Sequence, residues 1–140
     1  MSYPAPADDP VSVLIVDDEP ILAGSCVRIA MADGFIATST GRGWLALEYV
    51  RKRRPEIVLV ALELPDMRGM ALLEWIRSAS PETLVVMITD SAAGFRTEAI
   101  RAGAFDCIAK PFTSTQLRIL LGRAARQARD HQPREAPDEK

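Results

Sequence analysis

The 140-residue sequence has few of the residues that build disulfide frameworks, metal centres or membrane spans. It contains two isolated cysteines, Cys26 and Cys107, without metal-ligand spacing, and one histidine, His131, which lies in a polar tail and is a poor candidate for a catalytic base. Isolated thiols are typical of a reduced cytosolic chain rather than a secreted one. No apolar run reaches membrane-spanning length, and residues 1–10 lack the basic and apolar parts of a signal peptide. We therefore expect a cytoplasmic protein that does not bind membranes.

The chain also lacks an excess of charge of either sign. Its formal net charge is -2 and its pI is near 5.4, so there is no global attraction to nucleic acid or anionic lipid. A basic run, RKRR, stands at positions 51–54. Basic residues in the last turn of a helix favour the helix dipole, and we prefer this explanation to a nucleic-acid patch. We expect no nucleic-acid binding by this domain.

Acidic residues are concentrated where the first apolar run ends. Val11 to Val16 contains a single polar residue, is bounded by Pro10, and leads directly into Asp17, Asp18 and Glu19. Such a run is typical of a central strand that is covered on both faces. A helix cap at Asp18 or Glu19, ahead of Pro20, would explain one acid. Three neighbouring acids repel one another and indicate a nearby cation.

The rest of the chain alternates between short apolar runs and helical patterns. Strands are expected at about 11–16, 35–38, 57–62, 84–89 and 105–109. Helices are expected at about 21–32, 43–53, from Gly69 to Ala79, at 93–102, and after a cap at Thr113 or Ser114. Five strands alternating with five helices predict an α/β fold with a doubly wound parallel sheet.

The two ends of the chain differ from its middle. Residues 1–10 and 130–140 are rich in proline and charge and have no hydrophobic periodicity, so we expect both to be disordered. The second segment could be a tail, or a linker to an effector domain. Residues 11–129 are expected to form one domain, large enough to bury a single core without a metal or disulfide.

Ligands of such sheets bind beyond the carboxyl ends of the strands. Five residues are expected there: Asp17, Asp18, Ala61, Thr89 and Lys110. The motifs that carry them, VLIVDDEP, LPDMRG, VVMITD and GAFDCIAKPF, occur in order at their expected spacing. From about residue 11 to 129 the sequence resembles the receiver domain of bacterial two-component response regulators. The resemblance implies a flavodoxin-like sheet with strand order 2-1-3-4-5.

The resemblance also implies a phosphoryl switch. In that family an aspartate at the end of the third strand receives a phosphoryl group from a histidine kinase, and Mg2+ neutralises the transferring oxygens. Asp17 and Asp18 match the acids that hold Mg2+. Thr89 matches the hydroxyl that binds the phosphoryl group, and Lys110 matches its cationic partner. Pro111 matches a cis-proline.

The position that the family gives to the acceptor, four residues before Pro65, is Ala61. A methyl group cannot be phosphorylated, and its presence removes a metal ligand. Mg2+ should therefore bind more weakly, by more than the roughly 10 to 100-fold that losing an outer-shell partner costs. We expect Mg2+ to be weakly held and no cofactor to be required.

Three further departures from the family pattern accompany Ala61. Asp90 replaces the small residue after Thr89, Cys107 replaces the aromatic three residues before Lys110, and Arg68 replaces the acid or Asn before Gly69. Several changes together favour a natural pseudo-receiver, a non-enzymatic module that acts by protein contact. An ordinary phosphorylated receiver with an engineered Asp-to-Ala change at position 61 is the alternative. An enzyme or ligand-binding domain that uses the acidic pocket is a third, but no nucleophile with an adjacent base supports it.

Losing the acceptor leaves the Lys110 ammonium without its usual partner. We predict that it pairs with Asp17, Asp18 or Asp90, with Asp90 partly replacing the missing charge; Asp90 could equally point to solvent. The implied partners are a histidine kinase, an effector domain or another receiver.

A homodimer through the last two helices is a further hypothesis, because Arg118, Arg126 and Arg129 share one face of the last helix. That face could also be a solvated surface. Trp44 and Trp75 are interpreted as packing residues rather than as platforms for stacking bases.

Overall fold

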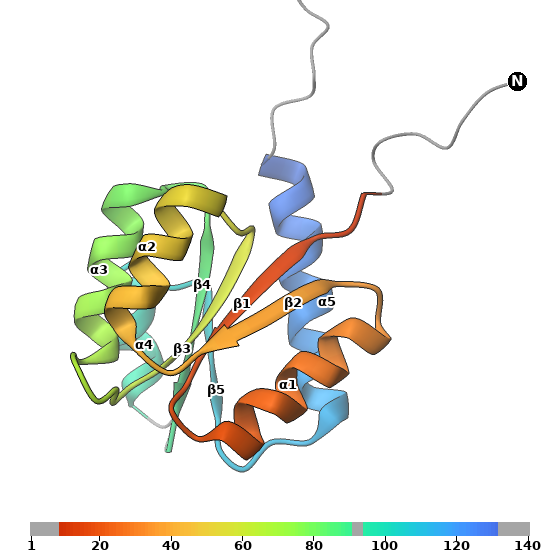
Figure 1. The fold of residues 1–140 in the computed structure, drawn as a ribbon, viewed down its shortest axis with the longest axis horizontal. Helices are drawn as coiled ribbons and strands as arrows, with labels where there is room; N and C mark the ends of the chain where they lie inside the picture. The colour runs from red at the N-terminus through yellow and green to blue at the C-terminus, as the bar shows by residue number, and fades with distance from the viewer. Residues whose placement is uncertain (1–8, 91–93, 132–140) are drawn as a thin grey trace, which may run out of the picture.

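The computed structural model describes residues 9–90 and 94–131, along which strands and helices alternate (Figure 1). The strands are β1 (Ser12–Val16), β2 (Ile36–Thr40), β3 (Ile57–Ala61), β4 (Leu84–Thr89) and β5 (Asp106–Ala109). The helices are α1 (Pro20–Ala32), α2 (Gly43–Arg53), α3 (Gly69–Ala79), α4 (Phe95–Arg101) and α5 (Ser114–His131). The predicted α/β fold is confirmed.

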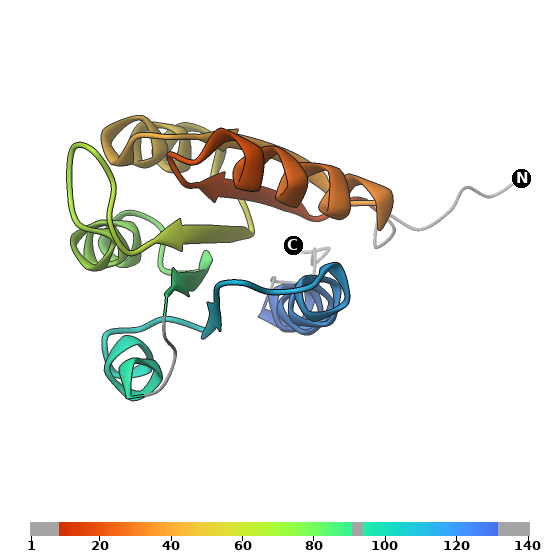
Figure 2. The same cartoon turned by 90° about the horizontal axis from the view of Figure 1, so that it is seen from below.

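The strands form one parallel sheet in the order β2-β1-β3-β4-β5, as predicted. Helices α1 and α5 cover one face of the sheet, and α2, α3 and α4 cover the other (Figures 1 and 2). In register, Val16 lies opposite Thr40 and Val60, and Thr89 lies opposite Ala109. All strands therefore end at the same edge, where the chain places its acidic residues.

The central strands bury both faces, which explains their nearly continuous apolar sequences. Leu14 and Val16 belong to the core cluster beneath α2 and α3, whereas Val13 and Ile15 belong to the cluster beneath α1 and α5. β3 divides its side chains in the same way. Because successive side chains on a strand point to opposite faces, an apolar run without alternation requires helices on both sides.

Several predicted boundaries shift by one or two residues. α1 begins at Pro20 rather than 21, and β2 spans Ile36–Thr40 rather than 35–38. β3 ends at Ala61 rather than 62, and β5 begins at Asp106 rather than 105. Strand ends are set by ladder hydrogen bonds with neighbouring strands, which hydrophobicity does not report.

The ends of the domain were predicted less closely. α4 spans only Phe95–Arg101, and residues 91–93 at its predicted start lie outside the described residues. α5 continues to His131, two residues beyond the predicted boundary at 129. The predicted disorder of residues 1–10 and 130–140 otherwise falls mainly on residues 1–8 and 132–140, which also lie outside the described residues.

Helix caps explain some of the polar residues at helix starts. The Gln116 N–H donates to Thr113 Oγ1 over 3.0 Å, and the Thr113 N–H donates to Gln116 Oε1 over 2.8 Å. This capping box confirms the predicted start of α5. Glu19 and Arg68 occupy the N-cap positions of α1 and α3, but neither side chain makes a capping hydrogen bond. Capping therefore does not explain the acidic triplet.

The tryptophans and the basic run lie on the outer surface of α2 and α3. Trp44 and Trp75 are exposed and contact each other, with ring centroids 6.0 Å apart. Lys52 pairs with Glu48 over 3.0 Å, and Arg53 lies over the Tyr49 ring. The aromatic pair is packed as expected, but against itself rather than in the core.

The start of α2 is capped from a distant loop. Asp66, between β3 and α3, accepts hydrogen bonds from the Gly43 N–H over 2.8 Å and the Trp44 N–H over 3.0 Å. Burial alone raises the pKa of the Asp66 carboxyl, but these hydrogen bonds outweigh it and lower the pKa below its usual 3.8. The carboxylate thus joins the loop beside the strand ends to α2.

Replacing Asp66 with Ala should lower the free energy of unfolding by about 1 kcal/mol at neutral pH, because two N–H groups lose their acceptor. A carboxyl group whose pKa is lowered by folding stabilises the folded state above its unfolded pKa, and that contribution disappears as the pH falls through the folded pKa. The difference from the unsubstituted chain should therefore shrink below pH 3.8. Urea unfolding between neutral and acidic pH measures it. Asp66→Asn keeps an acceptor oxygen and should lose the pH dependence; an Ala variant as stable as the parent contradicts the cap.

Candidate functional site

The ends of β1, β3, β4 and β5 surround a cavity of about 330 Å3. Its lining contains five carboxylates, one ammonium group and several apolar side chains. The lining residues are Asp17, Asp18, Glu19, Ala61, Leu62, Glu63, Leu64, Pro65, Ile88, Asp90 and Lys110. The predicted meeting of the strand ends therefore brings Asp17, Asp18, Ala61, Asp90 and Lys110 to one site.

Two of the predicted site residues do not line this cavity. Thr89 ends β4 and is buried, and its carbonyl accepts the Lys110 backbone N–H over 2.7 Å. Cys107 lies two residues into β5 and lines a different hollow, beside α5. Thr89 is at the carboxyl end of its strand as predicted, whereas Cys107 is near the start of β5; the direction of each side chain depends on strand pleat and packing.

Asp17 is the most deeply buried acid at the cavity. Its Oδ1 accepts the Glu19 N–H over 2.9 Å, so the carboxylate holds the turn between β1 and α1. Asp18 and Glu19 are exposed. Asp17 thus stabilises the turn after β1, whereas Asp18 and Glu19 line the cavity with exposed side chains.

Lys110 supplies the cation that the acidic triplet requires. Its Nζ lies 3.4 Å from Asp17 Oδ2 and 3.4 Å from Glu19 Oε1. The predicted pairing of Lys110 is therefore confirmed for Asp17, and Glu19 is a partner that sequence reasoning missed. Among the described residues Lys110 makes no ion pair with Asp18 or Asp90, so the proposed compensating role of Asp90 in this pair is wrong. Asp90 is exposed at the cavity.

The charges around Asp17 change the ionisation of its neighbours. Burial alone lowers the pKa of Lys110, but the charges of Asp17 and Glu19 outweigh it and raise that pKa above its usual value. Lys110 is therefore a stable cation at neutral pH. Burial, and then the Asp17 charge, raise the pKa of the Cys26 thiol to about 11. Cys26 is thus an inert core thiol, as its 1 % exposure suggests.

Ala61 ends β3 beneath a tightly folded loop. The Gly69 N–H donates to the Leu62 carbonyl over 2.7 Å, and the Leu64 N–H donates to the Met67 carbonyl. A side chain at Gly69 would overlap the Ala61 carbonyl oxygen. Glycine is required because α3 starts directly against the strand end. The start of α3 therefore packs directly against the backbone of Ala61. The Ala61 side chain lines the cavity.

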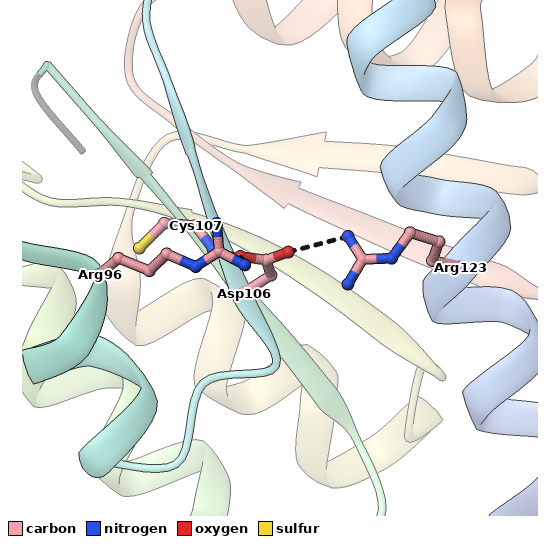
Figure 3. A network of polar contacts seen from close by, with 4 residues as sticks. All are labelled: Arg96, Asp106, Cys107 and Arg123. Atoms are coloured by element: carbon pink, nitrogen blue, oxygen red, sulfur yellow. Dashed lines mark hydrogen bonds and ion pairs between the residues drawn. The ribbon is translucent and has the colours of Figure 1, made fainter. Parts of the chain in front are cut away.

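Cys107 belongs to a polar network between α4, β5 and α5 (Figure 3). Its N–H donates to Asp106 Oδ1 over 2.8 Å. The same carboxylate pairs with Arg96 of α4 over 3.0 Å and with Arg123 of α5 over 2.9 Å. Burial, and then the Asp106 charge, raise the pKa of the Cys107 thiol. The side chain at position 107 therefore lies beside a buried carboxylate that is paired with two partly exposed arginines.

Sequence reasoning missed this cluster. The only signal was an acid at the start of an otherwise apolar strand, in GAFDCIAK. Asp106 is 3 % exposed, and a buried carboxylate requires a partner. The partners, Arg96 and Arg123, come from two different helices, so no local pattern identifies them.

The Mg2+ that the resemblance implies can be compared with the residues present. Asp17 and Asp18 are oxygen donors of the right chemistry. Among residues 9–90 and 94–131, however, no three or more His, Cys, Asp or Glu side chains are grouped to hold a metal ion. Lys110 already occupies the space beside Asp17 Oδ2. The described residues therefore do not fit a dedicated Mg2+ centre.

No helix in the described part of the chain is both long and apolar enough to span a bilayer.

The sequence model of the response regulator receiver domain matches residues 13–121. This match covers most of the chain, so the protein belongs to the response regulator receiver domain family. The predicted family is confirmed, and receiver domains as a class interact with histidine kinases and effector domains.

Similar proteins are longer than this chain. The probable transcriptional regulatory protein TcrX of Mycobacterium tuberculosis is 37% identical over 119 residues, which are 81% of this chain and 51% of TcrX. The regulatory protein AtoC of Escherichia coli is 33% identical over 113 residues, 80% of this chain and 24% of AtoC. This chain therefore spans about half or less of the curated relatives described here.

Solved receiver domains have the same fold over nearly their whole length. The receiver domain of NtrX from Brucella abortus superimposes with a TM-score of 0.77 at 32% identity, over 81% of this chain and 98% of that one. A CheY-like receiver domain protein from Methanospirillum hungatei has a TM-score of 0.82 at 23% identity, over 88% and 99% of the two chains.

Proposed function

We propose that this protein is a pseudo-receiver of two-component signalling, which is not phosphorylated at position 61 and acts through protein contacts. The observation that carries the proposal is Ala61 at the end of β3, lining the cavity in which a receiver would hold its acceptor. An alanine side chain offers no oxygen to a phosphoryl donor. In this proposal the domain regulates its partners and does not catalyse a reaction.

The pairing of Lys110 supports the same proposal. In a phosphorylated receiver this cation would pair with the phosphoryl group, whereas here it is held 3.4 Å from both Asp17 and Glu19. Lys110 therefore neutralises part of the negative charge of the cavity, although no acceptor carboxylate or phosphoryl group is there. Mg2+ has a secondary place in this proposal: Asp17 and Asp18 would hold it weakly, and no step depends on it.

The candidate contact surface lies along β5 and α5. Ile119 of α5 is exposed and lines a hollow of about 430 Å3 together with Pro111, Leu120 and Arg123. One of the three arginines that motivated the dimer hypothesis, Arg118, forms an intramolecular ion pair with Asp33 over 2.9 Å. The exposed Ile119 at this mixed hollow, rather than the Arg118 face, is the feature on which we base a homodimer that involves α5, the last of the two helices.

Light scattering tests both parts of the proposal. We expect a mass above the 15.3 kDa monomer at high concentration, reduced by Ile119→Arg, and unchanged by acetyl phosphate with Mg2+. Ser78→Arg, exposed on α3 and outside the last two helices, is the control for added charge. A 15.3 kDa monomer at every concentration contradicts the dimer. A mass that responds to acetyl phosphate contradicts the pseudo-receiver.

A further inference from the structure

The outer surface of α2 and α3 carries both tryptophans of the chain, and both are exposed. Trp44 and Trp75 are 53% and 47% exposed, and Leu45, next to Trp44 in the chain, is 54% exposed. The two helices lie side by side over one face of the sheet (Figures 1 and 2). Tryptophan is highly buried on average in folded proteins, and an exposed apolar patch is a sign of an interaction site. We call Trp44, Leu45 and Trp75 the tryptophan face.

The loop after β3 holds the tryptophan face in place. Asp66 accepts the Trp44 N–H over 3.0 Å, and the Met67 side chain packs against Gly43, where a Cβ would overlap it. The rings of Trp44 and Trp75 also contact each other, with centroids 6.0 Å apart. A rigid aromatic pair loses little conformational entropy when a partner covers it. The tryptophan face is therefore already arranged for a contact.

Positive charge lies beside the tryptophan face on α2. Arg51 follows Trp44 by two helical turns, so both belong to the same side of the helix. Lys52 pairs with Glu48 over 3.0 Å. In the described part of the chain, neither Arg51 nor Arg54 makes an ion pair. The helix dipole favours basic residues at this end of α2, but it does not account for exposed tryptophans beside them.

The chemistry of this surface distinguishes between two classes of partner. A single-stranded nucleic acid stacks its bases on aromatic faces, but the rings of Trp44 and Trp75 are tilted by 56° and do not offer parallel stacking faces. The net charge of -2 also opposes the approach of a polyanion. An acidic protein segment with apolar side chains matches both parts of the surface, because carboxylates pair with arginine and apolar side chains cover tryptophan.

We propose that the tryptophan face and the arginines beside it bind an acidic, leucine-rich segment of a partner protein. Leucine side chains of the segment cover Trp44 and Trp75, and its carboxylates pair with Arg51 and Arg54. Tryptophan and arginine are the residues that most commonly dominate the binding energy of protein interfaces. This surface on α2 and α3 is separate from the hollow beside α5, and its binding does not depend on phosphorylation at position 61.

The test follows tryptophan fluorescence, which reports on this surface alone because both tryptophans of the chain belong to it. The probe is a tryptophan-free peptide, acetyl-EELLELLEE-amide, added to the full chain. We expect a saturable blue shift of the emission and protection from acrylamide quenching, with a dissociation constant below roughly 1 mM. The peptide acetyl-EEGGEGGEE-amide, which keeps the acids but lacks leucine, should bind at least about tenfold more weakly.

A charge reversal tests the role of arginine. Arg51→Glu should weaken binding of the acidic leucine peptide about tenfold or more, because it replaces an attraction with a repulsion. The lysine counterpart, acetyl-KKLLKLLKK-amide, should bind this variant more tightly than it binds the parent. Arg101→Glu is the matched control, since Arg101 is also an exposed arginine in the last turn of its helix, α4. It should leave the dissociation constant of the acidic peptide unchanged.

An apolar truncation tests the role of tryptophan. Trp44→Ala should weaken binding about tenfold, with Trp75 as the remaining reporter. Ile100→Ala, at a side chain of α4 that is 45% exposed, is the matched control and should not change it. Circular dichroism confirms that each variant is folded.

Binding that requires both the leucines of the peptide and Arg51 of the protein supports the proposal. Absence of a blue shift, equal binding of the acidic and basic peptides to the parent, or binding that Arg51→Glu leaves unchanged overturns it. A deoxythymidine oligonucleotide is the final probe. Tighter binding of the oligonucleotide than of the acidic peptide assigns the surface to nucleic acid and overturns the proposal, whereas weaker or absent binding supports it.

Discussion

Replacing Ala61 with Asp is expected to let the chain accept a phosphoryl group from acetyl phosphate in the presence of Mg2+. The new carboxylate would join Asp17 and Asp18 at the cavity, supplying both a nucleophile and a third oxygen ligand. Without Mg2+ the added like charge should lower the free energy of unfolding by about 1 to 3 kcal/mol, and Mg2+ should restore it. Intact-mass spectrometry and urea unfolding measure the two effects.

Ala61→Asn has nearly the same shape and no nucleophilic oxygen, so it is the control and should remain unmodified. Asp90 at the cavity should slow the approach of an anionic donor. In the Ala61→Asp background, Asp90→Ala should therefore raise the rate several-fold, while Glu82→Ala, before β4 at the opposite edge of the sheet, should not. A chain that stays unmodified with both Ala61→Asp and Asp90→Ala would show that more than the acceptor has been lost.

Removing Arg96 and Arg123 together is expected to cost about 3 kcal/mol of unfolding free energy, because it leaves the buried Asp106 carboxylate without a cation. Each single Ala variant should cost only about 1 kcal/mol, since the other arginine stays paired. The arginine side chains are 56% and 47% exposed, which places the expected loss at the low end for a buried pair. A double-mutant cycle by urea unfolding measures this non-additivity.

The matched control is the Arg101→Ala and Arg126→Ala pair, which removes one exposed arginine from each of the same helices. That pair should cost less than about 1 kcal/mol. Adding Asp106→Leu to the double variant should recover part of the loss, because it removes the unpaired charge. If the effects of Arg96→Ala and Arg123→Ala simply add, the two arginines do not share the stabilisation of one carboxylate.

The fold could be predicted from sequence because its signals are local. Val13 to Val16 and Ile57 to Val60 are apolar without alternation, which requires cover on both faces of a sheet. The capping box at Thr113 fixed the start of α5. The strand order came from the family resemblance, since the chain pattern alone left several topologies open.

The site could be predicted in outline, because parallel strands end at one edge and carry Asp17, Ala61, Asp90 and Lys110 there. Its pairing could not. Lys110 reaches Glu19 as well as Asp17 because the turn after β1 is folded by the Asp17 carboxylate. The turn itself is local, but Lys110 comes to it from the end of β5, and that approach has no local sequence signal. The Asp106 cluster was missed because its partners also come from distant elements, the helices α4 and α5.

The residue at position 61 determines which chemistry the cavity at the strand ends can perform. The end of β3 is held by Gly69 against the start of α3, so position 61 has a fixed backbone and an apolar side chain. Lys110 then pairs with the acids that remain. The account therefore depends on one chemical claim, that the cavity accepts no phosphoryl group.

The most direct measurement of that claim is the intact mass of the unsubstituted chain after incubation with acetyl phosphate and Mg2+, with the Ala61→Asp variant showing that the reaction can be detected. The account predicts an unchanged mass at every time point. A stable increment of one phosphoryl group on the unsubstituted chain would contradict it.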